Sequence, residues 1–180
     1  MGTDLGKLVE SHVHDVPDFP KPGVVFKDLS PLFADGTAFR ELVDGLVESY
    51  RGPDGSLDFD VVAGIEARGF FIAAAVGYAS GVGVVPVRKA GKLPRETISA
   101  SYSLEYGEAT LEVHSDAFIA GHRVLVVDDV LATGGTAEAT LSLVERAGGI
   151  VAGFCVLLEL GFLEGRSRLL GRDVRALLTV

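Results

Sequence analysis

Residues Arg123 to Thr136 read Arg-Val-Leu-Val-Val-Asp-Asp-Val-Leu-Ala-Thr-Gly-Gly-Thr, which combines an apolar strand with a glycine-containing turn. Val124 to Val127 form a short run rich in β-branched side chains, typical of a strand buried on both faces of a parallel sheet. We expect Asp128 and Asp129 to follow that strand, and a short loop to lead into a helix that begins near Ala137. Ligands of open α/β sheets bind where strands end and helices begin, so the stretch predicts both a fold class and a ligand site.

The loop in this stretch has the chemistry of a phosphate site. Gly134 and Gly135 let backbone approach an anion without a Cβ in the way, Thr133 and Thr136 add hydroxyl donors, and a helix start presents unpaired N–H groups. The acid pair would repel a phosphate, but it could accept hydrogen bonds from the vicinal hydroxyls of a phosphorylated ribose. The carboxylates could also stabilise positive charge at the anomeric carbon or hold Mg2+ through water. The prediction is a ribosyl-phosphate site; an ordinary strand-loop-helix turn with a capping Thr is the alternative.

The composition predicts one domain over residues 1–180, because a chain of 180 residues can bury a sizeable core. Apolar residues make up 48% and glycines number 23, which suits an α/β protein with many tight turns. A mean hydropathy of +0.36 favours a buried interface between subunits. The net charge of −9 argues against binding to nucleic acid or to an anionic membrane. Cys155 reads as a buried thiol, and no disulfide framework or secretory signal is recognised, so we expect a cytoplasmic protein.

Hydrophobic patterns and turn residues predict the other elements. Residues 69–87 are uncharged, but their glycines and Pro86 divide them into a helix over Gly69–Ala79 and a strand from Val84, not a membrane span. Prolines in Asp18–Leu32 predict an extended, turning segment without a regular helix and with backbone groups free of a ladder. The remaining expected elements are a helix over Met1–Asp15, a helix from a cap at Asp35 or Thr37 through Tyr50, a helix over Ala137–Ala147, strands over Phe59–Ala63, Ile150–Leu158 and Val174–Val180, and a β-hairpin over Glu96–His114.

Cationic side chains follow two of the predicted strands. Arg68 follows the first, and a basic run follows the second, with Arg88, Lys89, Lys92 and Arg95. At the end of a parallel strand in an acidic chain, such a run favours contact with an anion over solvated surface. A planar heterocycle could stack on Phe26, although the residues alone slightly favour a core-capping loop without a ligand.

Residues Val126 to Thr136 resemble the 5-phosphoribosyl-1-pyrophosphate motif of the type I phosphoribosyltransferases in composition, order and spacing. Three further segments are similar to the adenine phosphoribosyltransferases: residues 18–32, Arg-Lys-Ala-Gly-Lys-Leu-Pro at 88–94, and Ala-Ser-Tyr-Ser-Leu-Glu-Tyr-Gly at 100–107. The resemblance implies an α/β fold in which helices flank a central, mostly parallel sheet. It also implies a small N-terminal hood over about residues 15–35 and a flexible β-hairpin flap over about residues 90–114.

The resemblance also assigns roles to residues. It implies that adenine is bound by Val25, Phe26 and Lys27, where the family commonly has Arg at the third position, and that ribose is held by the catalytic pair Asp128 and Asp129. The implied phosphate site comprises Leu131, Ala132, Thr133, Gly134, Gly135 and Thr136, and the implied pyrophosphate site comprises Arg68, Arg88, Lys89 and Lys92. Glu105 would be a third catalytic residue that helps to manage the proton of the base, Tyr106 would help the flap to close, and a cis peptide, if one is present, is expected at Glu66-Ala67.

The reaction implied by the resemblance transfers the 5-phosphoribosyl group from 5-phosphoribosyl-1-pyrophosphate to N9 of adenine, forming AMP and pyrophosphate in purine salvage. The expected cofactor is Mg2+ on the substrate, without direct protein ligands, and the expected assembly is a homodimer. One alternative is a transferase for another base, which would differ in residues 24–27 and in the flap. A second is a non-enzymatic regulator, which the net charge disfavours. A phosphorelay receiver also ends a strand with an Asp pair, but near its N-terminus.

Overall fold

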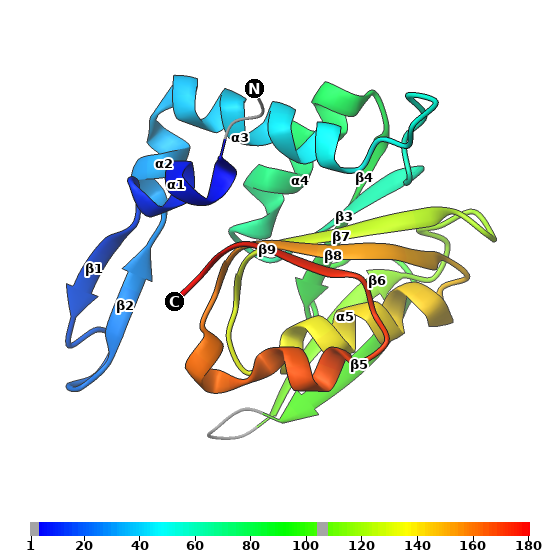
Figure 1. Cartoon of the computed structure of the whole chain (residues 1–180). Helices are drawn as coiled ribbons and strands as arrows, with labels where there is room; N and C mark the ends of the chain where they lie inside the picture. Colours follow the sequence, from blue (N-terminus) through cyan, green and yellow to red (C-terminus); the bar gives the residue numbers. More distant parts are fainter. Residues whose placement is uncertain (1–3, 104–107) are drawn as a thin grey trace.

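The strand β7 (Arg123–Leu131) lies inside a seven-stranded sheet whose order is β5-β6-β4-β3-β7-β8-β9 (Figure 1). The structure is a computed structural model, which describes residues 4–103 and 108–180. Val124 to Val127 are each at most 1% exposed, which confirms the prediction of a strand buried on both faces. The strand is longer than predicted, however, and the pairs Asp128↔Val156 and Leu131↔Glu159 place the acid pair within β7 and not after it.

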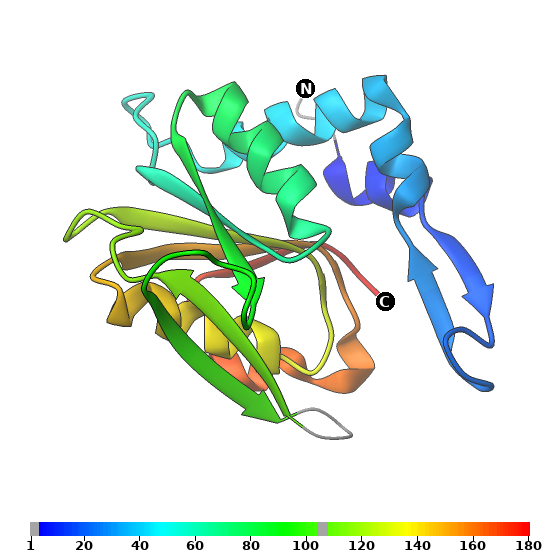
Figure 2. The ribbon, with the colours of Figure 1, turned by 180° about the vertical axis from the view of Figure 1, so that it is seen from behind.

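Parallel pairing dominates the sheet. Four strands run parallel in the series with β7, namely β3 (Val61–Ile65), β4 (Gly83–Lys89), β8 (Ile150–Glu159) and β9 (Val174–Thr179). The hairpin of β5 (Thr97–Ser103) and β6 (Glu108–His114) adds antiparallel strands beside β4, as Figure 2 shows from behind. The predictions of a mostly parallel sheet and of a hairpin over Glu96–His114 are therefore confirmed.

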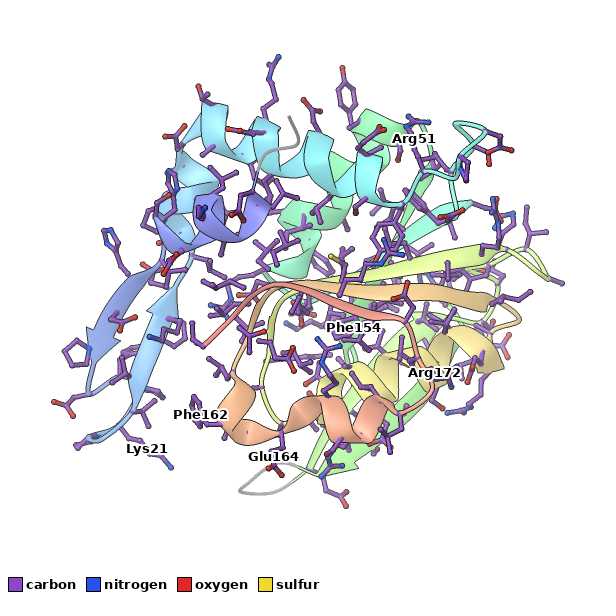
Figure 3. The ribbon with its side chains drawn as sticks, in the orientation of Figure 1. Lys21, Arg51, Phe154, Phe162, Glu164 and Arg172 are labelled. Atoms are coloured by element: carbon purple, nitrogen blue, oxygen red, sulfur yellow. The ribbon has the colours of Figure 1, made fainter. Side chains whose placement is uncertain are left out.

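Helices cover both faces of the sheet. The helices α3 (Gly36–Ser49) and α4 (Gly69–Ser80) lie on one side and α5 (Gly135–Arg146) lies on the other (Figure 1). Side chains of β7 alternate between the two resulting cores: Leu125 and Val127 pack with the first layer, Val124 and Val126 with the second. Phe154, labelled in Figure 3, is 1% exposed and belongs to the core on the α5 side.

Local signals explain the ends of the helices. The Asp35 side chain accepts hydrogen bonds from the Thr37 and Ala38 amides at 2.9 and 3.0 Å, so it is the cap of α3. Helix α4 ends at Gly81, whose φ of +74° is readily available only to glycine. In the part of the chain that the structure describes, no helix is long and apolar enough to cross a membrane. Cys155 is 2% exposed and burial raises its pKa to about 12, as expected of an inert buried thiol.

The N-terminal segment differs from its prediction. The first helix, α1 (Leu5–Glu10), is shorter than the expected Met1–Asp15, because His14 and Asp15 belong to β1 (His14–Pro17). That strand pairs with β2 (Val25–Asp28), so the expectation of backbone groups free of a ladder was wrong at Val25 and Phe26. The expected exclusion of helix was also wrong at α2 (Ser30–Ala34), since Pro31 lies in the first turn, where its missing N–H has no helical partner to lose.

The β1-β2 hairpin projects away from the main sheet on the side where the carboxyl end of β7 lies (Figure 1). It occupies the residues expected to form the hood. On the same side, two short 3-10 helices, η1 (Gly161–Leu163) and η2 (Gly165–Leu169), connect β8 to β9. The β1-β2 hairpin from the N-terminal part of the chain and the η1-η2 connector from the C-terminal part therefore both lie near the carboxyl end of β7.

Candidate functional site

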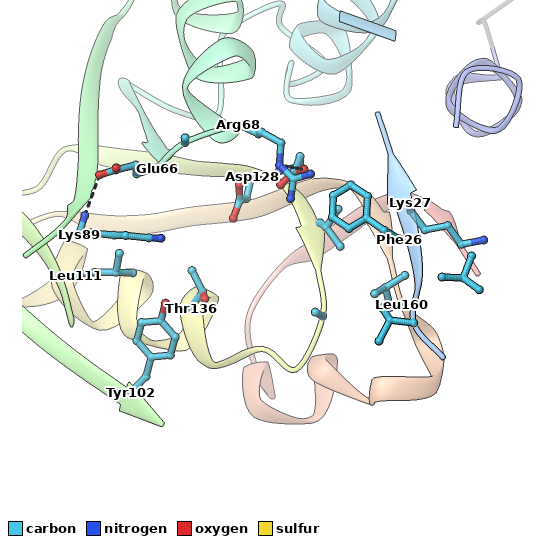
Figure 4. Close-up of a pocket in the computed structure, with 16 residues that line it drawn as sticks. Phe26, Lys27, Glu66, Arg68, Lys89, Tyr102, Leu111, Asp128, Thr136 and Leu160 are labelled. Atoms are coloured by element: carbon cyan, nitrogen blue, oxygen red, sulfur yellow. Dashed lines mark hydrogen bonds and ion pairs between the residues drawn. The ribbon is translucent and has the colours of Figure 1, made fainter. Parts of the chain in front are cut away.

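A pocket of about 400 Å³ lies at the carboxyl ends of β3, β4 and β7, between the β1-β2 hairpin and the β5-β6 hairpin (Figure 4). This is the edge at which parallel sheets bind ligands. Several predicted site residues line it together: Val25, Phe26, Lys27, Arg68, Lys89, Asp128, Asp129, Ala132 and Thr136. Residues that lie far apart in sequence thus converge on one cavity.

The acid pair forms one wall of the pocket. The Asp129 amide donates to Asp128 Oδ1 at 2.9 Å, and Asp129, which is only 4% exposed, has its Oδ2 2.8 Å from Arg68 Nε. Burial, and then the negative charge of Asp129, raise the pKa of Asp128 well above its ordinary value of 3.8. Burial also raises the pKa of Asp129, although the positive charge of Arg68 opposes that rise. Both carboxylates are therefore poorly solvated and suited to a ligand that supplies hydroxyl donors or positive charge.

The predicted phosphate loop leads directly from the acid pair into α5. Gly134 has a φ of +84° and stands at the N-cap of α5, so the helix begins at Gly135, two residues before the expected Ala137. The first N–H groups of such a helix have no partner within it and point out of its N-terminus. A smaller hollow of about 80 Å³ is lined by Leu131, Ala132, Thr133, Gly134 and Thr136 among others. A hollow next to the N-terminus of a helix suits an esterified phosphate.

The predicted pyrophosphate-binding cations separate into two groups. Arg68 and Lys89 line the pocket, whereas Arg88 and Lys92 form ion pairs with Glu66, which also accepts the Lys89 amide at 3.0 Å. Burial acts to raise the pKa of Glu66, but the hydrogen bonds from Lys92 and from the Lys89 amide hold it below its ordinary value. The peptide Glu66-Ala67 is cis, as expected if a cis bond is present. Glu66 therefore holds Arg88 and Lys92 at the wall of the pocket through ion pairs.

The hairpin side of the pocket presents Phe26 and Lys27. The Phe26 ring lies below the Arg68 guanidinium, with 5.3 Å from Cζ to the ring centroid. Lys27 Nζ donates to Asp15 at 2.7 and 2.8 Å, and its side chain points away from the pocket (Figure 4). A backbone contact of Lys27 with a base is compatible with this orientation, whereas a stacking role of its side chain is not.

Some pocket residues were not recognised in the sequence. Glu66 was named only as one end of a cis peptide, although its place after a buried strand is the same signal that singled out Arg68. Tyr102 was treated only as part of the flap pattern, yet it lines the pocket beside Thr136 (Figure 4). Leu111 and Leu160 line the pocket as apolar residues, for which the sequence offers no distinguishing signal. The predicted Glu105 and Tyr106 lie outside the described residues.

Known proteins resemble this chain over most of its length. Residues 33–170 match the model of the phosphoribosyl transferase domain family. A relative in Salinispora tropica, an adenine phosphoribosyltransferase, is 74% identical over 99% of this chain and 93% of its own length, and one in Thermobifida fusca is 56% identical over 100% of both. The crystal structure of the enzyme from Thermoanaerobacter pseudethanolicus has a TM-score of 0.90 at 46% identity, covering 97% of this chain and 99% of that one.

The Saccharomyces cerevisiae enzyme, solved in complex with adenine and an imino-altritol bisphosphate, has a TM-score of 0.88 at 39% identity, with 97% of this chain and 98% of that chain covered. The fold and the site define a phosphoribosyltransferase, and the chain belongs to that family. Within it, the full-length relatives place the chain among the adenine phosphoribosyltransferases. The family, the fold and the pentosyl transfer to adenine that the sequence predicted are thereby confirmed.

Proposed function

We propose that 5-phosphoribosyl-1-pyrophosphate and adenine react in the pocket at the carboxyl end of β7, giving AMP and pyrophosphate. The observation that carries this assignment is the convergence of the acid pair, two residues of the loop (Ala132 and Thr136) and two cations on a single cavity. These groups complement the three parts of the sugar substrate: a 5′-phosphate, vicinal hydroxyls and a second, doubly phosphorylated arm.

The 5′-phosphate is assigned to residues 131–136, and the ribose hydroxyls to Asp128 and Asp129. Arg68, which is paired with Asp129, and Lys89 also line the pocket and suit the pyrophosphate, while Arg88 and Lys92 are paired with Glu66. Adenine is assigned to the side of Phe26, where an aromatic ring and apolar neighbours suit a planar base.

In the proposed reaction, N9 of adenine forms a bond to the anomeric carbon, while the bond from that carbon to pyrophosphate breaks and the leaving oxygen keeps the electron pair. The proton from the base passes to an acceptor, for which Glu105 remains the candidate by resemblance. Positive charge develops at the anomeric carbon, and the nearby carboxylates stabilise it. The remaining contribution of the chain is positional, since it holds the two substrates in line within one cavity.

Mg2+ fits the donor set of this pocket. The carboxylates of Asp128 and Asp129 are hard oxygen ligands, and the Asp129 Oδ2 atom lies within ion-pair distance of Arg68 without an aligned hydrogen bond. Mg2+ keeps several of its waters and combines carboxylate contacts with substrate phosphates. When bound, it would neutralise charge on the leaving pyrophosphate, and the acid pair would hold its water ligands.

A homodimer is the proposed assembly. Phe71 and Tyr78 on α4 are 58% and 92% exposed, and α4 flanks a hollow of about 480 Å³ that includes Arg40 and Val43 of α3. Two exposed aromatic side chains on one helix, about two turns apart, favour burial against a second copy. Sedimentation equilibrium should give twice the chain mass, and Tyr78→Glu should shift the protein to monomer. A monomeric wild-type protein would contradict the proposal.

The activity is tested by incubating the protein with the activated sugar, Mg2+ and one base at a time, and following nucleotide by chromatography. AMP should form with adenine much faster than nucleotides form with guanine, hypoxanthine or uracil. A preference for hypoxanthine would contradict the assignment of adenine to the Phe26 side. No product with any base would contradict the proposed reaction.

A further inference from the structure

Backbone atoms of the phosphate loop and of the connector between β8 and β9 approach each other closely. A Cβ built on Gly134 would lie 2.3 Å from the carbonyl oxygen of Gly165. A Cβ built on Gly165 would lie 2.1 Å from the carbonyl oxygen of Ala132 and 2.9 Å from the Gly134 nitrogen. Such distances leave no room for a side chain at either position, so the two turns fit against each other only as glycines.

The connector is fixed at this point by an ion pair between the exposed Arg166 and the buried Glu159. Arg166, the residue after Gly165, donates from Nη2 and Nε to the Glu159 carboxylate at 2.6 and 3.1 Å, and from Nη1 to the Val174 carbonyl at 2.8 Å. Glu159 is only 7% exposed and ends β8 in register with Leu131 of β7. A forked, charge-assisted contact to a buried carboxylate fixes both distance and orientation. Gly165 is therefore held relative to the strand that leads into the phosphate loop.

A second attachment ties the connector to the helix beyond the loop. Arg168 Nη1 lies 3.3 Å from Glu138 Oε2 in the first turn of α5, and the side chain of Leu169 is 3% exposed in the core beneath that helix. Of the exposed connector residues, Phe162 is 74% exposed and Glu164 also lies on the surface (Figure 3). The inner face of the connector thus contacts both the loop and α5.

We infer that Glu159, Gly165 and Arg166 form a brace that sets the shape of the phosphate loop and so determines affinity for the phosphate end of the sugar substrate. These are positioning residues, because the ion pair acts through Gly165 on Ala132 and Gly134. A loop with two adjacent glycines has many accessible conformations, and holding it in one of them reduces the ordering cost of binding. The inference rests on the proposed assignment of the 5′-phosphate to this loop.

Gly165→Ala is the direct test. No left-handed φ is required at Gly165, so the added methyl group changes space and not backbone conformation. The affinities of ribose 5-phosphate and of AMP should fall about tenfold or more, while that of pyrophosphate should change less than about twofold, because only the loop is displaced. Arg166→Lys keeps the charge but loses the two-pronged contact with Glu159, so it should also lower the affinity for ribose 5-phosphate, by a smaller factor. It also serves if Gly165→Ala does not fold.

Gly161→Ala is the matched control in the same connector. Its methyl group would lie 3.1 Å from the Thr179 side chain and 3.5 Å from the Val180 carbonyl. This variant should bind ribose 5-phosphate, AMP and pyrophosphate as the wild type does. Calorimetry gives the affinities, and the melting temperature is recorded for each variant. The inference would be overturned if Gly165→Ala lowered the melting temperature without changing the ligand affinities. It would also be overturned if Gly165→Ala weakened the binding of ribose 5-phosphate and of pyrophosphate by the same factor.

Nuclear magnetic resonance of the wild-type protein separates this inference from the proposed function. Titration with ribose 5-phosphate should shift the amide signals of residues 133–137. If those signals do not move, the phosphate assignment itself fails. If they move and Gly165→Ala binds ribose 5-phosphate as the wild type does, the brace inference alone fails.

Discussion

Arg68 Nε lies 2.8 Å from Asp129 Oδ2, while the same guanidinium lies 5.3 Å above the centre of the Phe26 ring. One cation therefore contacts both an acid assigned to the ribose and an aromatic ring assigned to the base (Figure 4). A second anion in the pocket would compete with Asp129 for Arg68. The two substrate subsites are thus linked through a single side chain.

We expect pyrophosphate to strengthen the binding of adenine, because drawing Arg68 towards the anion uncovers the Phe26 ring. The dissociation constant of adenine should fall by about fivefold or more when pyrophosphate and Mg2+ are present, a common size for coupling between sites. Arg68→Gln should abolish this coupling and weaken pyrophosphate binding. Arg51→Gln, which removes an exposed pair with Glu48, is the control. Equal adenine affinity with and without pyrophosphate in the wild type would contradict the proposed link.

Asp129→Asn should reduce kcat by about a hundredfold or more, since a neutral amide stabilises developing positive charge far less than a carboxylate does. The amide is nearly isosteric, and burial raises the pKa of the Asp129 carboxyl, so the neutral side chain should not lower the melting temperature at neutral pH. Asp116→Asn, which affects an exposed acid paired with Arg95, controls for loss of one charge. Steady-state kinetics at saturating substrates measures the effect, and wild-type turnover in Asp129→Asn would remove this residue from the mechanism.

The stability of the ligand-free protein should depend on Asp128 with a defined sign. Its pKa in the folded state is raised by burial and by Asp129, so the folded state binds the proton more tightly than the unfolded state. As pH rises from the ordinary value of 3.8 through the folded pKa, the contribution of Asp128 to the free energy of unfolding therefore falls.

Asp128→Asn removes this titration. The variant should gain melting temperature relative to the wild type as pH increases from 4 to 8, whereas the two should converge near the acid end of that range. Thermal denaturation without ligands at a series of pH values provides the measurement. If the difference in melting temperature between Asp128→Asn and the wild type did not change with pH, the pKa of Asp128 would not be raised in the folded state.

The sequence allowed much of the central sheet to be predicted, because its signals are local and repeated. Val124 to Val127 predicted a doubly buried strand. A cap at Asp35 or Thr37 predicted the start of α3, and the structure shows that Asp35 is the cap. Both signals are local, because apolar runs and caps act over a few neighbouring residues. The end of β7 was placed too early because Asp128 and Asp129 are polar. In the structure their backbones continue the ladder with β8, and pairing with a neighbour overrides the local signal.

The remaining errors and omissions concern partners that are distant in sequence. The pairing of β1 with β2 could not be read from prolines alone, and the contact of Gly134 with Gly165 joins two turns without any side-chain pattern. The sequence also could not show that Arg88 and Lys92 pair with Glu66, because Glu66 lies more than twenty residues before them. Sequence reasoning identified which residues gather at the site, while the structure shows which of them are already paired.

Phe26 and Lys27 should differ sharply in their effect on adenine, although they are adjacent. Phe26→Ala should raise the KM for adenine about tenfold, because it removes an aromatic face from the pocket. Lys27→Met should change that KM by less than about threefold, because the ammonium group pairs with Asp15 in a partly exposed position and such pairs contribute little. Initial rates at saturating activated sugar measure both effects. If Lys27→Met raised the KM for adenine as much as Phe26→Ala does, the lysine side chain would have to turn into the pocket when adenine binds.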